Sequence, residues 1–89
     1  MDFSILKLAG VSQQLLAEIM KVTPASVSYW VKGRPMTAKR AATLVKLLGI
    51  FRDAVEQGAL PTNKESYADH AKYVKTLIIE ALRRNPPQA

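Results

Sequence analysis

Basic side chains lie close together in the middle of the chain, at Lys32, Arg34, Lys39 and Arg40. Thr37, which falls among them, can cap a helix whose first N–H groups and positive dipole end suit a phosphate. A single lysine or arginine is most often a solvated surface charge. Their grouping beside a helix start, taken together with the pattern of helices described below, instead favours the binding of a phosphate-bearing polyanion.

No group of residues in the sequence is typical of catalysis or of metal binding. The single histidine, His70, lies beside Asp69 and has no partner at a metal-ligand or catalytic spacing, so we expect a surface or interface histidine. No Ser–His–Asp order, pair of catalytic carboxylates or glycine-rich phosphate loop stands out. The absence of cysteine excludes disulfides and thiolate metal sites. We therefore expect no enzyme, no cofactor, no metal and no small-molecule substrate.

Length and composition describe one small domain, or one domain with a helical extension, in a chain of 89 residues. The net charge of +6 and the pI near 9.9 favour polyanionic partners. The N-terminus carries Asp2 and only a brief apolar run, which is unlike a signal peptide. No apolar run approaches the ~20 residues that span a bilayer. We expect a protein of the bacterial cytoplasm or nucleoid that does not associate with membranes.

Two short helices with a tight turn between them are predicted near the middle of the chain. The first runs over Gln13–Met20 after an N-cap at Ser12, and the second over Pro24–Lys32 after an N-cap at Thr23. Proline suits the first helical position, and Gly33 is the expected stop of the second helix. A turn this short forces the helices to cross steeply, as in a helix-turn-helix.

A helix is predicted on either side of this pair. The preceding helix is capped by Asp2 or Ser4 and ends near Ala9, with Gly10 as its stop. The following helix begins after Thr37, and its apolar stripe comprises Ala41, Leu44, Val45, Leu48, Phe51 and Val55. We expect this helix to continue to Gln57, and a break at Gly49 is the alternative.

The last part of the chain, residues 59–89, is predicted to be a linker and one further helix, separate from a domain over residues 1–58. The helix starts between residues 63 and 67, after a capping pair that is either Thr62 with Glu65 or Ser66 with Asp69. It ends at residues 85–87, where two prolines follow an asparagine. Its apolar stripe comprises Tyr67, Ala71, Val74, Leu77, Ile78, Ala81 and Leu82.

This stripe is our candidate surface for joining two copies of the chain. Its spacing resembles a coiled-coil stripe of about two and a half heptads. The residues that we expect at the dimer interface are Tyr67, Ala71, Val74, Leu77, Ile78 and Leu82. In the alternative arrangement, the helix folds back onto its own domain.

Taken together, the pattern resembles the lambda-repressor and Cro-like family of helix-turn-helix regulators. The resemblance runs from Leu6 to about Leu48, and its matching positions are Gly10, Val11, Ser12, Gln13, Leu16, Ala17, Val22, Thr23, Ser26, Val27, Ser28, Trp30, Gly33 and Arg34. It implies an all-α fold, a lambda-repressor-like helix-turn-helix domain of about five helices with a C-terminal helical extension. The family often has glycine where this chain has Lys21, which would be strained by roughly 1 kcal/mol if left-handed.

The resemblance also implies which residues would meet DNA. Base edges would be read from the second helix of the motif, by Pro24, Ala25, Ser28 and Tyr29. Phosphates would be bound by Gln13, Ser26, Lys32, Arg34, Lys39 and Arg40. Since the first two base-reading residues are apolar, we expect few direct hydrogen bonds to bases and a large contribution from DNA shape.

The sequence leaves open which side chain near the end of the motif points inward beside Val27. Val27 is spaced to point inward together with either Val31 or Trp30. Trp30 is expected in the core, and the N–H at the edge of its ring could also reach a phosphate.

The preferred hypothesis is a sequence-specific, double-stranded-DNA-binding transcriptional regulator. It would be a repressor of the phage or plasmid kind that binds a palindromic operator as a homodimer, with half-site centres ~34 Å apart. The alternative is an antitoxin-like or other protein-interaction module that uses the C-terminal helix. A DNA-bending architectural protein is a weaker third hypothesis, because no apolar wedge on a minor-groove arm is visible.

Overall fold

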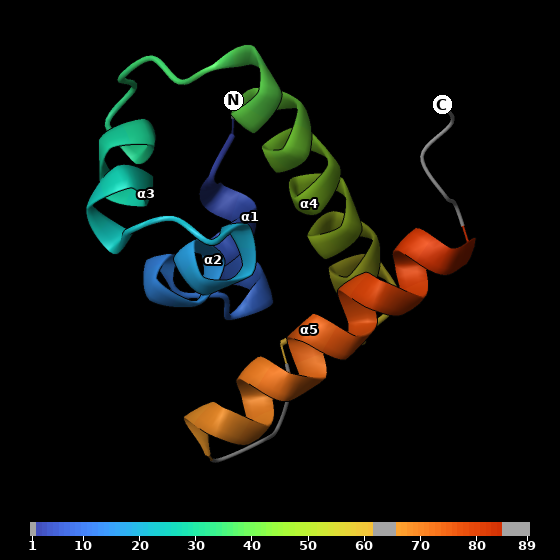
Figure 1. Cartoon of the computed structure of the whole chain (residues 1–89). Helices are drawn as coiled ribbons and strands as arrows, with labels where there is room; N and C mark the ends of the chain where they lie inside the picture. The colour runs from blue at the N-terminus through green and yellow to red at the C-terminus, as the bar shows by residue number, and fades with distance from the viewer. Residues whose placement is uncertain (1, 62–65, 85–89) are drawn as a thin grey trace.

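The computed structural model describes residues 2–61 and 66–84, and over these ranges the chain contains α-helices and no strand (Figure 1). The helices are α1 Ser4–Ala9, α2 Gln13–Met20, α3 Pro24–Val31, α4 Ala38–Glu56 and α5 Tyr67–Arg84. The predicted all-α fold is therefore confirmed. The predicted capping pair Thr62 with Glu65, and the predicted end of the last helix at residues 85–87, lie outside the described residues.

Hydroxyl groups cap the starts of α2, α3 and α4, as predicted. Each side-chain oxygen accepts a hydrogen bond from the amide three residues later, and the pairs are Ser12–Leu15 at 3.0 Å, Thr23–Ser26 at 3.2 Å and Thr37–Arg40 at 3.2 Å. At α1 the prediction is wrong, because the N-cap residue is Phe3 and not Asp2 or Ser4; Asp2 lies one residue earlier, where its Oδ1 accepts the Ser4 amide at 2.9 Å. These local bonds satisfy N–H groups that have no acceptor within a helix.

Helices α1 to α4 all end in the same way, with a left-handed residue that turns the chain back over the last turn. The left-handed residues are Gly10, Lys21, Gly33 and Gly58, with φ values of 71°, 58°, 87° and 77°. In each case the next residue's N–H donates to the carbonyl five residues earlier, through the pairs Val11–Leu6 at 2.9 Å, Val22–Ala17 at 3.0 Å, Arg34–Tyr29 at 3.1 Å and Ala59–Ala54 at 2.8 Å. This is the Schellman arrangement. Among the described residues, Lys21 is the one non-glycine with a positive φ.

The inward face of α3 is formed by Val27 and Trp30, which are both buried. Val31 is exposed, so Trp30 is the inward partner of Val27. The helix also ends one residue earlier than predicted, at Val31, and Lys32 occupies the C-cap position before the left-handed glycine.

Helix α4 runs through Gly49 without a break, as we preferred. Its buried residues are Leu44, Leu47, Leu48, Phe51 and Ala54. Val45 was predicted in this stripe and is 59% exposed, so that assignment is wrong. The reason is tertiary: α4 packs against both α1 and α5, which widens its buried arc toward Leu47 and Ala54 and leaves Val45 outside.

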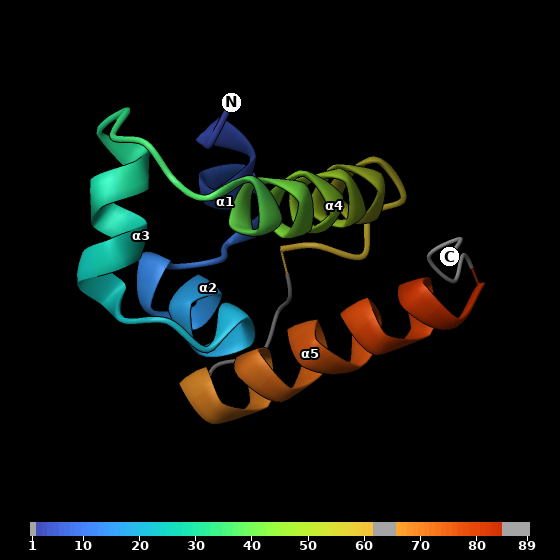
Figure 2. The ribbon, with the colours of Figure 1, turned by 45° about the horizontal axis from the view of Figure 1, so that its top comes forward.

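The last helix folds back onto its own chain, which is the second of the two arrangements that the sequence left open. Ala71, Val74 and Ile78 are buried in the common core, and Leu77 and Leu82 are partly buried against it. In the views of Figure 1 and Figure 2, α2 lies between α3 and α5, so the last helix does not cover α3.

Polar contacts join α5 to the turn after α1 and to the last turn of α2. His70 Nε2 lies 2.7 Å from the Gly10 carbonyl oxygen. The Glu18 carboxylate accepts a hydrogen bond from the Tyr67 hydroxyl at 3.5 Å and pairs with Lys75 Nζ at 3.6 Å. Such an exposed ion pair contributes about 0–1 kcal/mol, so burial of the apolar face is the larger attachment.

Candidate nucleic-acid interface

The outer face of α3 is open to solvent and presents the four predicted base-reading residues. Pro24, Ala25 and Tyr29 are exposed, and Ser28 is half-buried. Residues four positions apart share a helix face, so Ala25 and Tyr29 stand one turn apart on the same side. The helix packs on α2 through its opposite side, and α5 lies beyond α2 (Figure 2). A partner molecule with a groove that fits α3 could therefore bind this face without displacing any other helix.

The positive charge of the chain is concentrated in the stretch of sequence that contains α3. No acidic residue occurs between Glu18 and Asp53. The basic residues within that stretch are Lys21, Lys32, Arg34, Lys39, Arg40, Lys46 and Arg52. They exceed the net charge of +6, so the remainder of the chain carries no excess of positive charge. This distribution favours a polyanion at α3 and the start of α4.

The start of α4 forms one side of an open hollow. It is lined by Met20, Thr37, Lys39, Arg40 and Thr43, where the end of α2 meets the first turn of α4. Arg40 Nη1 donates to the Met20 carbonyl oxygen at 3.4 Å. Arg40 therefore ties the two helices together, while Lys39 remains exposed beside the positive end of the α4 dipole.

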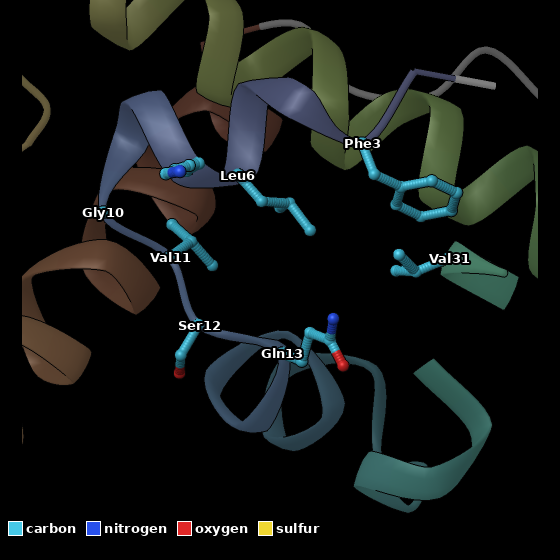
Figure 3. Close-up of a pocket in the computed structure, with 8 residues that line it drawn as sticks. Phe3, Leu6, Gly10, Val11, Ser12, Gln13 and Val31 are labelled. Atoms are coloured by element: carbon cyan, nitrogen blue, oxygen red, sulfur yellow. The ribbon is translucent and has the colours of Figure 1, made fainter. Parts of the chain in front are cut away.

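Gln13 lies at the start of α2, on the rim of a second hollow that faces the end of α3. Figure 3 shows its amide directed toward the space between α2 and Val31. Phe3, Leu6 and Val11 line the same hollow from α1 and the loop that follows it (Figure 3). The amide is exposed and close to the end of α3, as expected of a side chain that would bind a phosphate beside that helix.

The other predicted phosphate-binding residues differ in whether their side chains already make contacts within the protein. Lys32 and Arg34 are exposed at the C-terminal end of α3. The Ser26 hydroxyl is half-buried and lies 3.0 Å from the Thr23 hydroxyl, so it is already part of the N-terminal cap.

The sequence reasoning missed one contact, between Arg34 and Tyr29. The Arg34 guanidinium carbon lies over the Tyr29 ring, 5.3 Å from its centroid. A signal for it exists in the sequence, since a glycine cap at Gly33 brings the residue after it back to the residue four positions before the glycine.

The predicted dimer-interface residues differ in burial: some lie in the core, some lie at its edge, and one is exposed. Ala71, Val74 and Ile78 lie in the core of their own chain, and Leu77 and Leu82 lie at its edge. Tyr67 is exposed at the start of α5, near Glu18.

Within residues 2–61 and 66–84, no group of three or more histidine, aspartate or glutamate residues is arranged to hold a metal ion. No helix in these same ranges is both long enough and apolar enough to cross a membrane.

An exposed helix, joined to its predecessor by a tight turn and surrounded by basic residues, defines a DNA-binding helix-turn-helix protein. A family model described as Helix-turn-helix, of the Cro and C1 type, matches residues 4–52, which is more than half of the chain. The chain therefore belongs to this family, and it is a DNA-binding transcriptional regulator. The comparison with curated proteins found no match, and neither did the comparison with solved structures.

Proposed function

We propose that this regulator binds a palindromic operator as a homodimer and represses transcription by blocking polymerase where the operator overlaps a promoter. The observation that carries the proposal is the exposed face of α3, within a stretch of sequence, residues 19–52, in which every charged residue is basic. We expect it to act in the bacterial cytoplasm or nucleoid, where its DNA would be found.

In the proposed complex, α3 enters a major groove with its first turns against the base edges. Pro24 and Ala25 pack on thymine methyl groups, and Ser28 and Tyr29 each make one hydrogen bond. The groups that bind phosphates on either side are Gln13, Lys32, Arg34 and Lys39, with Ser26 and Arg40 acting mainly through the caps and helix contacts that they hold.

The homodimer is proposed to use the outward side of α5, because the inward side is already buried. Tyr73 and Ile79 are exposed on opposite flanks of that side, and Ile79 lines a shallow hollow together with Lys72 and Lys75. Deletion of α5 would strip the core of Val74 and Ile78, so it cannot test the dimer alone. Ile79→Glu is the sharper change, and Lys72→Glu, which alters charge on the same helix without removing apolar area, is its control.

Selection of duplexes from a random pool tests the function. We expect enrichment of a two-fold symmetric site with half-site centres ~34 Å apart. The logarithm of the binding constant should fall linearly with the logarithm of salt concentration, with a slope of about −0.9 for each phosphate bound. Failure of the purified protein to retain any duplex at low salt would refute the proposal.

The exposed apolar residues on α5 also favour a second candidate, a protein-interaction module in which α5 binds a different protein. Gel filtration of the purified chain separates the two. A dimer that retains DNA supports the regulator, whereas a monomer that retains none supports the interaction module.

A further inference from the structure

The four helix ends described above differ in the side chains that they bring together. In a Schellman ending, the residue after the left-handed position contacts the residue five positions earlier, and that contact is commonly apolar. It is apolar in composition for three pairs here, namely Leu6 with Val11, Ala17 with Val22, and Ala54 with Ala59. At the end of α3 the pair is Tyr29 with Arg34.

Tyr29 and Arg34 are joined by a backbone hydrogen bond and a cation–π contact, and a second backbone hydrogen bond beside them closes the turn. The Arg34 amide donates to the Tyr29 carbonyl oxygen at 3.1 Å, and the Gly33 amide donates to the Trp30 carbonyl oxygen at 2.9 Å. The Arg34 side chain then returns over the Tyr29 ring, at 5.3 Å from the centroid. Backbone geometry thus delivers the guanidinium to the ring.

Without this contact, little would hold the Tyr29 ring in one orientation. Its side chain is 56% exposed and stands on the outer face of α3. A planar guanidinium can stack its face on an aromatic ring and keep its edge N–H groups for other acceptors. Arg34 can therefore restrain Tyr29 and still donate to DNA.

We propose that Arg34 is a positioning residue for base recognition, which holds Tyr29 so that the two side chains meet DNA as one preorganised pair. This inference rests on the proposed function. Preorganisation raises affinity because the side chain has less freedom to lose on binding. It acts only where Tyr29 makes a defined contact, so it raises affinity for the selected site more than for other duplexes.

The test is a double-mutant cycle of Tyr29→Ala and Arg34→Lys. The lysine keeps the charge and lacks the planar face. Dissociation constants are measured on the duplex selected by the wild-type protein and on a scrambled duplex of equal length. Lys32→Ala is the matched control, since it removes a neighbouring charge from the same helix end. Thermal unfolding of each variant verifies that it remains folded.

We expect Arg34→Lys to weaken binding to the selected duplex by about two- to fivefold, the range for an exposed cation–π contact, and to leave the scrambled duplex nearly unchanged. Added to Tyr29→Ala, it should weaken binding no further. Lys32→Ala should weaken both duplexes alike and add fully to Tyr29→Ala. In the free protein, NMR should show upfield-shifted Arg34 methylene protons whose shift is lost in Tyr29→Ala.

Two results overturn the inference. One is an equal effect of Arg34→Lys on the two duplexes, and the other is full additivity with Tyr29→Ala. Either result leaves the proposed function intact when the wild-type protein selects a site. Absence of any duplex binding by the wild-type protein instead overturns the proposed function, and this inference with it.

Discussion

Replacement of Lys21 by glycine should stabilise the protein. Lys21 is left-handed, with φ 58° and ψ 45°, at the turn between α2 and α3. That conformation costs a residue with a Cβ about 1–2 kcal/mol, and glycine avoids it. Glycine also gives the unfolded chain more freedom, which removes about 0.5–1 kcal/mol of stability. We expect a net gain of about 0.5–1 kcal/mol from these two effects.

For a chain of this size, that gain corresponds to a rise of about 2–8 °C in the melting temperature. The assay is thermal or urea unfolding of the wild-type protein and of the variants Lys21→Gly, Lys21→Ala and Lys32→Gly. The alanine variant loses the same charge and keeps the strained conformation. Lys32 has φ −79° and is not left-handed, so its replacement by glycine should destabilise by about 0.5–1 kcal/mol.

The comparison of Lys21→Gly with Lys21→Ala tests for left-handed strain, because both variants lose the same positive charge and only the alanine keeps a Cβ. If the glycine variant is no more stable than the alanine variant, the argument from left-handed strain is wrong. Binding to duplex DNA should fall equally in both, since the turn keeps its geometry and each variant loses one positive charge.

Two further predictions follow from the conformation of glycines, and a third follows from the Asp2 carboxylate. Gly49→Ala should stabilise the protein by about 0.5–1 kcal/mol in thermal unfolding, because Gly49 lies within α4 and an added Cβ meets nothing within 4 Å; a loss of stability would contradict this. Gly10→Ala should destabilise more than Gly58→Ala, since both are left-handed but only at Gly10 would a Cβ lie 3.1 Å from Pro61 Cβ; equal losses would refute the contribution of that contact. Hydrogen bonds from Ser4 hold the pKa of Asp2 below its ordinary value, so the carboxylate stabilises α1 at neutral pH and this contribution is lost as the pH falls through the lowered pKa. The difference in the free energy of unfolding between wild type and Asp2→Asn should therefore shrink in acid. A difference that grows in acid would show that the ionised carboxylate does not stabilise α1.

The sequence predicted well those features that depend on neighbouring residues. Ser12, Thr23 and Thr37 each cap a helix through the amide three residues later, a contact that the chain makes with itself over one turn. Gly10 likewise ends its helix where predicted. The family and the all-α fold follow from the same local pattern, and both are confirmed.

Features that depend on distant packing were predicted less well. The spacing of α4 fits a stripe with Val45 as easily as one with Leu47, and contact with α1 and α5 decides between them. An apolar stripe on α5 likewise fits either a partner or its own domain, and the sequence left both open; the burial of Val74 in the core shows that the stripe packs on its own domain.

At the candidate interface, the sequence located the exposed residues of α3 and their basic neighbours. It did not predict that the Arg40 guanidinium would contact the Met20 carbonyl, or that Arg34 would lie over Tyr29. Both contacts depend on side-chain rotamers and on the angle between helices, which residue spacing does not specify.

The absence of acidic residues from residue 19 to residue 52 also limits how copies of this chain can assemble. Two such surfaces brought face to face would repel each other, and at physiological salt the repulsion would act over roughly 8 Å. The proposed homodimer is therefore expected to form through α5, where Asp69 and Glu80 accompany the lysines. Such a homodimer would leave the basic surface of each subunit available to a separate turn of the same double helix.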